Sequence, residues 1–262
     1  MADYRNLKIE RDGAVAHLRL ARTEVHNALD DQLIDELTRA AKELGCDATV
    51  RVVILSGEGK SFCAGADIGW MKRVMDYTAE ENKADSHRLA TMLRTLDRMP
   101  KPLVARVHGV ALGGGTGLVS ACDVVVASSE TRFAFSEVRL GILPAVISPF
   151  VLRRVGQGVA RALFLTGERF GAERALAIGL VDRVCEPDAL DQQVQTVVDH
   201  LVKGGPQAQA AIKELIPAVW GKTPEQAADL SVEANVKART SPEGQDGLGA
   251  FLEKRRPSWM DS

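Results

Sequence analysis

The sequence has few cysteines, and their spacing does not indicate a disulfide or a metal site. Its 262 residues include four cysteines that never form a C-x-x-C pair, and its five histidines never fall at metal-ligand spacing. We therefore expect reduced thiols, no disulfide and no structural metal. The cysteines are Cys46, Cys63, Cys122 and Cys185.

Long apolar runs and an excess of one charge are also missing. No run approaches the roughly 18 uninterrupted apolar residues of a membrane-spanning helix, and the N-terminal letters MADYRNLKIERDG lack the apolar core of a signal peptide. The formal net charge is -2, and the densest basic cluster is the short run Lys254-Arg255-Arg256. We therefore expect a cytoplasmic protein that binds neither nucleic acid nor a membrane.

The composition, 45% hydrophobic and 26% charged, suits a globular chain with a substantial core. Apolar runs of strand length alternate with amphipathic helical stretches up to Ser136, which predicts an α/β fold. Beyond Ser136 helices dominate, and the last third is expected to be a helical, assembly-forming region. Strands are expected at 7–10, 15–20, 52–55, from 103, at 124–126 and at 181–184, and helices at 29–44, 68–75, 80–99, directly after the glycine turn, and at 145–155, 158–166, 172–178, 189–203, 206–218, 224–238 and 243–254.

Three consecutive glycines, Gly113 to Gly115, stand between an apolar run and a segment of small residues that can begin a helix. Glycine allows a positive φ and a close approach of another group, and the first N–H groups of a helix favour negative charge. The turn therefore suits a phosphate or an oxyanion. A closely packed strand-to-helix turn explains the glycines equally well at this point.

Two nucleotide-binding motifs can be tested on the letters. A dinucleotide loop requires G-x-G-x-x-G, but counting from Gly113 the third glycine position is Leu118. The run Gly59-Lys60-Ser61 resembles the end of a P-loop, but the glycine required five places before Gly59 is Ile54. Both motifs are incomplete, which leaves a backbone oxyanion site as the functional interpretation.

Three motifs, in this order, resemble the crotonase superfamily, whose members include enoyl-CoA hydratases and isomerases. They are SFCAGADI at 61–68, VHGVALGGG at 107–115 and SEVRLG at 136–141, and the resemblance runs from VHNAL at Val25 to FLEKRRPSW ending at Trp259. It implies an α/β fold of the ClpP/crotonase type, a ββα spiral with two nearly perpendicular sheets. It also implies a spiral core with the acyl-CoA site at 1–195 and a helical oligomerisation region at 196–262, assembled as a homotrimer or a dimer of trimers.

The resemblance further implies an acyl-CoA thioester substrate and no separate cofactor, because coenzyme A is part of the substrate. The thioester carbonyl would be held by the backbone N–H groups of Ala66 and Gly114 while negative charge develops on it as an enolate. One such donor is worth about 3 to 4 kcal/mol in other enzymes. Contacts with coenzyme A are implied for Val25, Ala64, Ala66, Asp67, Ile68 and Gly114, and for Lys254 reaching a CoA phosphate of a neighbouring subunit.

Glu137 matches the general acid/base glutamate of the family. In a site walled by apolar residues its carboxyl would be desolvated, which raises the pKa and allows proton exchange with a substrate carbon near neutral pH. Taken alone, Ser136 followed by Glu137 also fits a capped helix start. The surrounding motif favours the catalytic interpretation.

A second glutamate of most enoyl-CoA hydratases is absent, because its position is Gly117 in this chain. Three interpretations follow. The protein is a hydratase that holds the attacking water by other means, a Δ3,Δ2-enoyl-CoA isomerase in which Glu137 alone carries the proton, or a non-catalytic acyl-CoA-binding homologue.

A narrower resemblance favours the hydratase. The letters DIGWMKRV, GGGTGL and SEVRLGILPAVISPFVLRRVG are similar to methylglutaconyl-CoA and isohexenylglutaconyl-CoA hydratases of leucine and acyclic-terpene breakdown. Those substrates bear a distal carboxylate. We expect a second protein carboxylate beside such a substrate to be unfavourable, since like charges repel in a pocket of low dielectric.

Other residues are expected to have structural roles. Cys63 has no base placed for it by the sequence and is expected to be a buried thiol. His108 is expected to be a structural hydrogen-bonding residue, and Arg139 an exposed charge. Trp70 and Met71 either line the acyl pocket or pack in the core.

Overall fold

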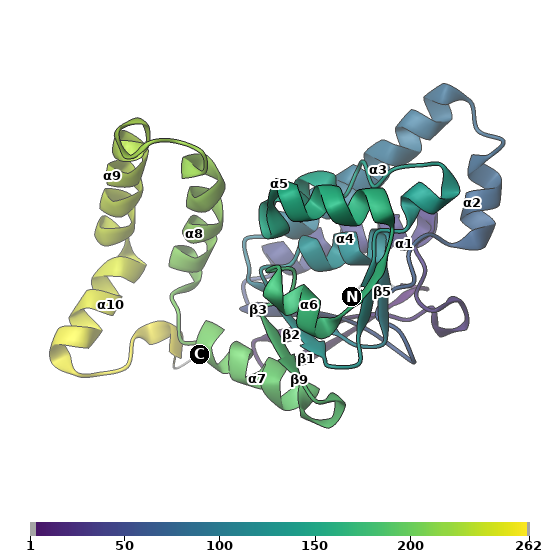
Figure 1. The fold of residues 1–262 in the computed structure, drawn as a ribbon. Coiled ribbons are helices and arrows are strands. Elements are labelled where there is room, and N and C mark those ends of the chain that lie inside the picture. The colour runs from purple at the N-terminus through teal and green to yellow at the C-terminus, as the bar shows by residue number, and fades with distance from the viewer. Residues whose placement is uncertain (1–3, 261–262) are drawn as a thin grey trace.

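The chain folds into two β-sheets with their covering helices and a helical arm (Figure 1). The computed structural model describes residues 4 to 260. The larger sheet has the strand order β1-β2-β3-β4-β6-β9, and the smaller one has the order β5-β7-β8. The strands are β1 (Leu7–Asp12), β2 (Val15–Leu20), β3 (Val52–Gly57), β4 (Leu103–Val107), β5 (Val110–Leu112), β6 (Val124–Ser128), β7 (Arg132–Ala134), β8 (Arg169–Gly171) and β9 (Arg183–Cys185).

The helices begin and end close to the expected positions. Within residues 4 to 260, no helix combines the length and the apolar character that crossing a membrane requires. The helices are α1 (Asp31–Cys46), α2 (Ile68–Val74), α3 (Ala79–Asp97), α4 (Gly114–Ser120), α5 (Ser148–Thr166), α6 (Ala172–Ala177), α7 (Leu190–Leu201), α8 (Pro206–Val219), α9 (Pro224–Thr240) and α10 (Pro242–Glu253), with 3-10 helices η1 (Thr23–Val25), η2 (Glu137–Leu140), η3 (Pro187–Ala189) and η4 (Ser258–Met260).

Strand β3 shows why strands of the larger sheet appear in the sequence as uninterrupted apolar runs. Val53 and Leu55 pack in one core cluster with side chains of α1 and α3, whereas Val52 and Ile54 pack in a second cluster with side chains of α7. Both faces of the strand are therefore covered, as expected for parallel strands. The antiparallel hairpin of β1 and β2, which turns at Gly13 with φ 53°, was expected from the letters Asp12-Gly13.

One expectation about the elements is incomplete, and another is confirmed in detail. Strands β5, β7 and β8 were not expected, because three-residue strands beside turns show no alternation of apolar and polar residues. Two separate helices were expected at 145–155 and 158–166. This division is confirmed, because the backbone leaves the helical conformation at Gly156, where φ is 74° and ψ is 165°, and so separates α5 into two helical segments.

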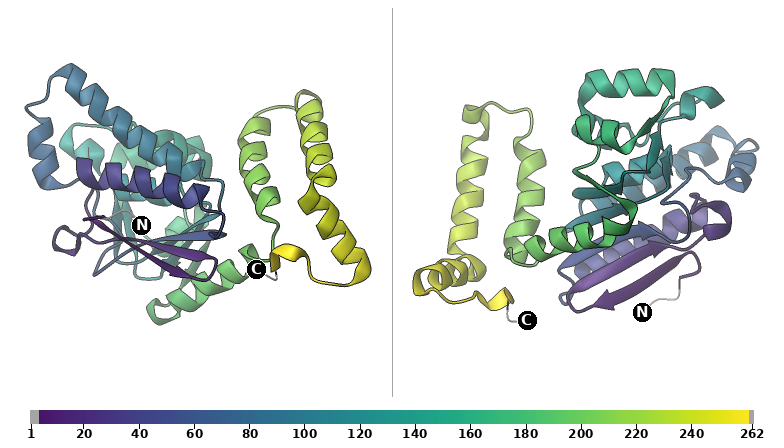
Figure 2. Two further views of the ribbon diagram at one scale, coloured as in Figure 1. Left: turned by 180° about the vertical axis from the view of Figure 1, so that it is seen from behind. Right: turned by 60° about the horizontal axis from the view of Figure 1, so that its bottom comes forward.

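Helices α8, α9 and α10 form an arm that stands beside the sheets in every view (Figures 1 and 2). One tie to the core is the Lys213 ammonium, which lies 2.5 Å from the Asp123 carboxylate. The expected boundary between residues 195 and 196 falls inside α7, whose apolar face packs on the larger sheet. The arm exposes large apolar side chains, which supports the expectation of assembly: Ile212, Ile216, Trp220, Leu230, Val232, Val236, Leu248, Phe251 and Leu252.

Candidate active site

Two segments of backbone run side by side at the centre of the site. Cys63 forms a parallel bridge with Ala111, and its N–H donates to the Val110 carbonyl at 3.1 Å. Further along, a Cβ atom at Gly65 would lie 2.9 Å from the Leu112 carbonyl oxygen and 3.9 Å from the Gly113 nitrogen. The residues directly before the two predicted donors, Ala66 and Gly114, are therefore neighbours in space.

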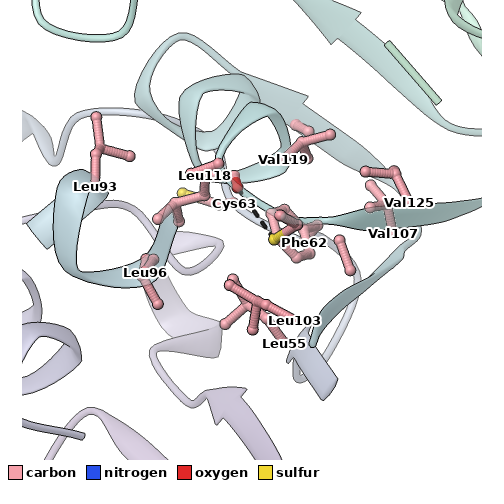
Figure 3. Close-up of a cluster of buried hydrophobic side chains, with 14 of the residues drawn as sticks. Leu55, Phe62, Cys63, Leu93, Leu96, Leu103, Val107, Leu118, Val119 and Val125 are labelled. Carbon is pink, nitrogen blue, oxygen red and sulfur yellow. Dashed lines mark hydrogen bonds between the residues drawn. The ribbon is translucent and has the colours of Figure 1, made fainter. Parts of the chain in front are cut away.

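The side chains behind these segments hold them in the core. Phe62 and Cys63 are fully buried and lie among Leu118 and Val119 of α4 (Figure 3). Because side chains in a protein interior are closely packed, the two segments cannot move apart without disrupting the packing of the core. The backbone groups at the site are therefore held in place before any ligand arrives.

The Ala66 N–H points away from the segment on its other side. The Leu29 N–H donates to the Gly65 carbonyl at 2.7 Å, and the Asp67 N–H donates to the Leu29 carbonyl at 2.8 Å. In an extended chain successive peptide groups point in opposite directions, so the Ala66 N–H faces away from Leu29. Within residues 4 to 260 no hydrogen bond is donated by this N–H.

Gly114 supplies the second free N–H because it is the first residue of α4, whose early N–H groups have no partner within the helix. The preceding Gly113 has φ 48° and ψ -117°, a conformation that glycine adopts without strain. A Cβ atom at Gly113 would lie 3.2 Å from Oε1 of Glu137. The glycine turn and the Glu137 carboxyl are thus direct neighbours, as the motifs predict.

Glu137 begins η2 and keeps its carboxyl largely out of water. Its Oε2 atom is buried and has no hydrogen-bond partner within the described residues. Burial raises the pKa of this carboxyl above its ordinary value of 4.5, and a hydrogen bond from its own backbone opposes the shift only in part. The carboxyl therefore keeps its proton to a higher pH than an ordinary glutamate does, a shift that favours general acid/base chemistry.

The raised pKa makes a prediction about stability. Between 4.5 and the raised pKa the folded protein binds more protons at Glu137 than the unfolded chain, so this contribution to stability is present at low pH and is lost as pH rises through the raised pKa. A Glu137→Gln variant lacks the penalty of ionising a buried carboxyl. We expect its free energy of unfolding relative to wild type to increase with pH, as measured by urea unfolding across this range. A difference that does not change with pH would contradict the prediction.

Gly117 is buried against Ile147, a contact that no sequence pattern indicates. A Cβ atom at Gly117 would lie 2.3 Å from Cγ2 and 2.9 Å from Cβ of Ile147, whose side chain is 3% exposed. The place that a second glutamate would need is therefore occupied by a branched apolar side chain. The absence of a carboxylate here is a matter of packing as well as of residue type.

The residues predicted to contact coenzyme A fall into two groups. Segments 25–29 and 64–68 lie together, since the Ala64 N–H donates to the His26 carbonyl at 3.0 Å, and Ile68 is 71% exposed beside them. The Asp67 N–H donates to Leu29 and its carbonyl accepts from the Met71 N–H at 2.8 Å, so its backbone groups are occupied. Lys254 is the C-terminal cap of α10, and Figure 1 shows α10 on the arm, at the opposite side of the molecule from α2, which Ile68 begins.

Cys63 and His108 are of residue types that often act in catalysis, but their contacts here are those of structural residues. Desolvation raises the pKa of the fully buried Cys63 thiol to about 12, which leaves it un-ionised at neutral pH. The Nε2 atom of His108 lies 2.9 Å from the Gly59 carbonyl oxygen. The expectations of a buried thiol and of a hydrogen-bonding histidine are confirmed. All four cysteines are free.

Two further expectations concern Arg139 and Trp70. Arg139 is exposed, and its Nε would lie 3.2 Å from a Cβ atom at Gly167, so its side chain runs along the end of α5. Trp70 is 7% exposed, and its indole N–H donates to Asp85 at 3.3 Å. Trp70 thus packs in the core.

Known proteins share both the sequence and the fold. A family model described as enoyl-CoA hydratase/isomerase matches residues 10–262. A short-chain-enoyl-CoA hydratase of Clostridium acetobutylicum is 34% identical over 97% of each chain, and a trans-2-decenoyl-[acyl-carrier-protein] isomerase of Streptococcus mutans is 31% identical over 98% of each. The crystal structure of an enoyl-CoA hydratase from Shewanella pealeana, 38% identical, matches with a TM-score of 0.94 over 97% of this chain and 96% of that one. The chain therefore has the crotonase fold and belongs to the enoyl-CoA hydratase/isomerase family of enzymes.

Proposed function

We propose that the protein is an enoyl-CoA hydratase-type lyase that adds water across the 2,3-double bond of an acyl-CoA thioester, or removes it in reverse. The Ala66 and Gly114 N–H groups bind the thioester oxygen, which becomes an enolate oxyanion as the bond to the β-carbon forms. Donors fixed in advance stabilise this charge without reorganising at the moment of reaction. Glu137 exchanges the proton with the substrate. The observation that carries the proposal is the buried Oε2 atom of Glu137, which has no hydrogen-bond partner within the described residues and belongs to a carboxyl beside the Gly113-Gly114 turn.

The remainder of the substrate is assigned to the surface next to these groups. We propose that Val25, Ala64, Asp67 and Ile68 line the path of coenzyme A, and that Lys254 of a neighbouring copy reaches one of its phosphates. The exposed apolar side chains of the arm support assembly into a homotrimer or a dimer of trimers. No cofactor other than the substrate's own coenzyme A is required by this reaction.

A branched substrate with a distal carboxylate, of the methylglutaconyl type, is the finer form of the proposal. Its support is the narrower sequence resemblance together with the contact between Gly117 and Ile147, which keeps a second carboxylate out of the site. A pocket with a single carboxylate avoids repulsion between protein and substrate charges.

The same contact supports a second candidate, a Δ3,Δ2-enoyl-CoA isomerase. Moving a double bond from the 3,4 to the 2,3 position requires one group that takes a proton from one carbon and returns it to another. Glu137 alone can do this, and the relative from Streptococcus mutans is named as an isomerase.

A spectrophotometric assay distinguishes these functions. The protein is incubated separately with crotonyl-CoA, 3-methylglutaconyl-CoA and a 3-enoyl-CoA, and the absorbance of the conjugated thioester is followed. Loss of absorbance indicates hydration, whereas a gain from the 3-enoyl compound indicates isomerisation. Tight binding without any change would favour a non-catalytic acyl-CoA-binding protein and contradict both proposals.

Adding a carboxylate at position 117 tests the role of local charge, provided that the packing is corrected. We expect Gly117→Glu alone to lower the free energy of unfolding by about 1 to 3 kcal/mol, because it overpacks the contact with Ile147. Ile147→Gly in the same chain should recover part of this loss, since contacting sites are not additive. Urea unfolding of the two single variants and the double variant measures the coupling.

The Gly117→Glu/Ile147→Gly variant then tests whether the substrate carries a carboxylate that is repelled by a second protein carboxylate. We expect it to turn over 3-methylglutaconyl-CoA more slowly than a matched Gly117→Gln/Ile147→Gly chain, which has the same shape without the charge. Faster turnover of the carboxylated substrate by the glutamate variant would show that the electrostatic hypothesis is wrong.

A further inference from the structure

Arg22 stands between two carboxylates close to the candidate site. Its Nη2 atom lies 2.9 Å from Oδ2 of Asp30 and 3.3 Å from Oδ2 of Asp67, and its Nη1 donates to the Ala28 carbonyl. The side chain of Arg22 is only 12% exposed, and those of Asp30 and Asp67 are 15% and 12% exposed. This is a mostly buried charge cluster, in which removing one member leaves the others uncompensated.

The second oxygen of each carboxylate caps a helix. Oδ1 of Asp30 accepts from the Leu33 N–H at 2.8 Å at the start of α1, and Oδ1 of Asp67 accepts from the Trp70 N–H at 3.0 Å at the start of α2. Such caps satisfy N–H groups that the helix itself leaves without partners. Arg22 therefore joins the beginnings of two helices through their capping residues.

The contacts of Arg22 surround the bridge between Leu29 and Ala66. Ala28 and Asp30 are the two chain neighbours of Leu29, and Asp67 follows Ala66 directly. The hydrogen bonds of Leu29 to Gly65 and Asp67 determine the direction of the Ala66 N–H, as described above. Arg22 thus contacts residues on both sides of the bridge that orients this N–H, through the Ala28 carbonyl and the side-chain carboxylates of Asp30 and Asp67.

We propose that Arg22 is a positioning residue for the reaction, which fixes the Ala66 N–H by holding Leu29 and Asp67 together. The inference rests on the proposed function, in which that N–H binds the thioester oxygen. The planar guanidinium of arginine carries several N–H donors, so it can contact Asp30, Asp67 and the Ala28 carbonyl at once. The ammonium group of a lysine cannot reproduce this geometry. Arg22 makes no contact with substrate in this scheme and acts through Ala66.

Loss of Arg22 should affect the transition state more than the bound substrate. The oxyanion interaction is stronger once charge has developed, so a displaced donor lowers kcat more than it raises KM. Misplacing a group by about 1 Å can cost roughly 100-fold in rate. We expect Arg22→Met to lower kcat by about 10- to 100-fold, with a much smaller change in KM, and Arg22→Lys to recover part of the loss.

The direct readout is the carbonyl stretch of a bound acyl-CoA labelled with carbon-13 at the thioester carbon. It is measured by infrared difference spectroscopy in a Glu137→Gln background, where turnover is slow. We expect the wild-type site to shift the stretch to lower frequency, and Arg22→Met to return it toward the value of the free thioester. Urea unfolding accompanies each variant, because a purely structural role would change stability without moving the carbonyl stretch.

Arg73→Met is the matched control. The Arg73 guanidinium lies 2.6 Å from the Asp31 carboxylate and links the same two helices, α2 and α1, but the two side chains are 50% and 40% exposed. We expect this variant to keep the wild-type kcat and carbonyl stretch, since exposed ion pairs contribute little. An equal effect of Arg73→Met would contradict a specific role for Arg22.

A folded Arg22→Met chain with unchanged kcat and carbonyl stretch would overturn the inference. If this variant does not fold, Asp67→Asn provides the second test, because the amide oxygen can still cap α2 while the ion pair is weakened. An unchanged stretch in Asp67→Asn would equally overturn it. Wild-type protein that binds no acyl-CoA would refute the proposed function and this inference with it, and wild-type protein that binds but does not turn over would refute the activity alone.

Discussion

Replacing Glu137 with glutamine is expected to lower kcat by about 10²- to 10⁴-fold, the usual contribution of a general acid/base group. The amide fills the same space beside Gly113 but cannot hold and release the proton. Because the carboxyl oxygen Oε2 has no partner to lose within the described residues, the change should leave the surrounding contacts intact. Steady-state kinetics on whichever acyl-CoA the wild type turns over provides the measurement.

The control for this experiment is Glu130→Gln, which makes the same chemical change at an exposed residue between β6 and β7. It should retain wild-type kinetics. A Glu137→Gln protein with kcat within about threefold of wild type would be incompatible with a general acid/base group at this position. Unchanged KM together with the loss of kcat would place the effect on the chemical step.

Replacing Gly114 with proline is expected to lower kcat by about 10²- to 10³-fold, the cost of one oxyanion donor in comparable sites. Proline removes the N–H but is well tolerated as the first residue of a helix, which is the position of Gly114 in α4. The fold of the turn should therefore survive the loss of the donor. Carbonyl stretching of a bound thioester should shift less than in wild type.

Gly114→Ala separates the loss of the N–H from the added bulk. Both variants place a carbon where it meets Cδ1 of Leu29 at 2.9 Å, a terminal methyl group that can move aside. Alanine keeps the N–H and should retain most of the activity. If the alanine and proline variants were equally impaired, crowding against Leu29 would explain the effect, and the donor role of Gly114 would be lost.

Much of the fold was predictable because local patterns and tertiary packing agree. The apolar run of β3 is covered on both faces, and α1 begins with Asp30 as its cap, so length, periodicity and capping all indicate the same elements. The three-residue strands β5, β7 and β8 were not predictable, since their pairing depends on segments that are distant in sequence. The break of α5 at Gly156, by contrast, was predicted, because separate helices were expected on either side of it.

The residues of the candidate site also fall into those that could be predicted from the sequence and those that could not. The roles of Glu137 and the two backbone donors were predicted from a resemblance over several motifs, because a glutamate after a serine and a run of glycines are ambiguous by themselves. Ile147 and Arg22 could not be found in that way. Their roles arise from contacts with Gly117 and Asp67, 30 and 45 residues away along the chain, and no local pattern reports such contacts.

The contact between Gly117 and Ile147 also limits how this enzyme can evolve. A lineage that acquired a glutamate at position 117 first would pass through an overpacked protein, and one that truncated Ile147 first would pass through a protein with a cavity that costs roughly 2 kcal/mol or more. We therefore expect either order to lower the stability of the intermediate protein. In terms of stability, a carboxylate at position 117 is reached more easily by a coordinated pair of mutations than by either mutation alone.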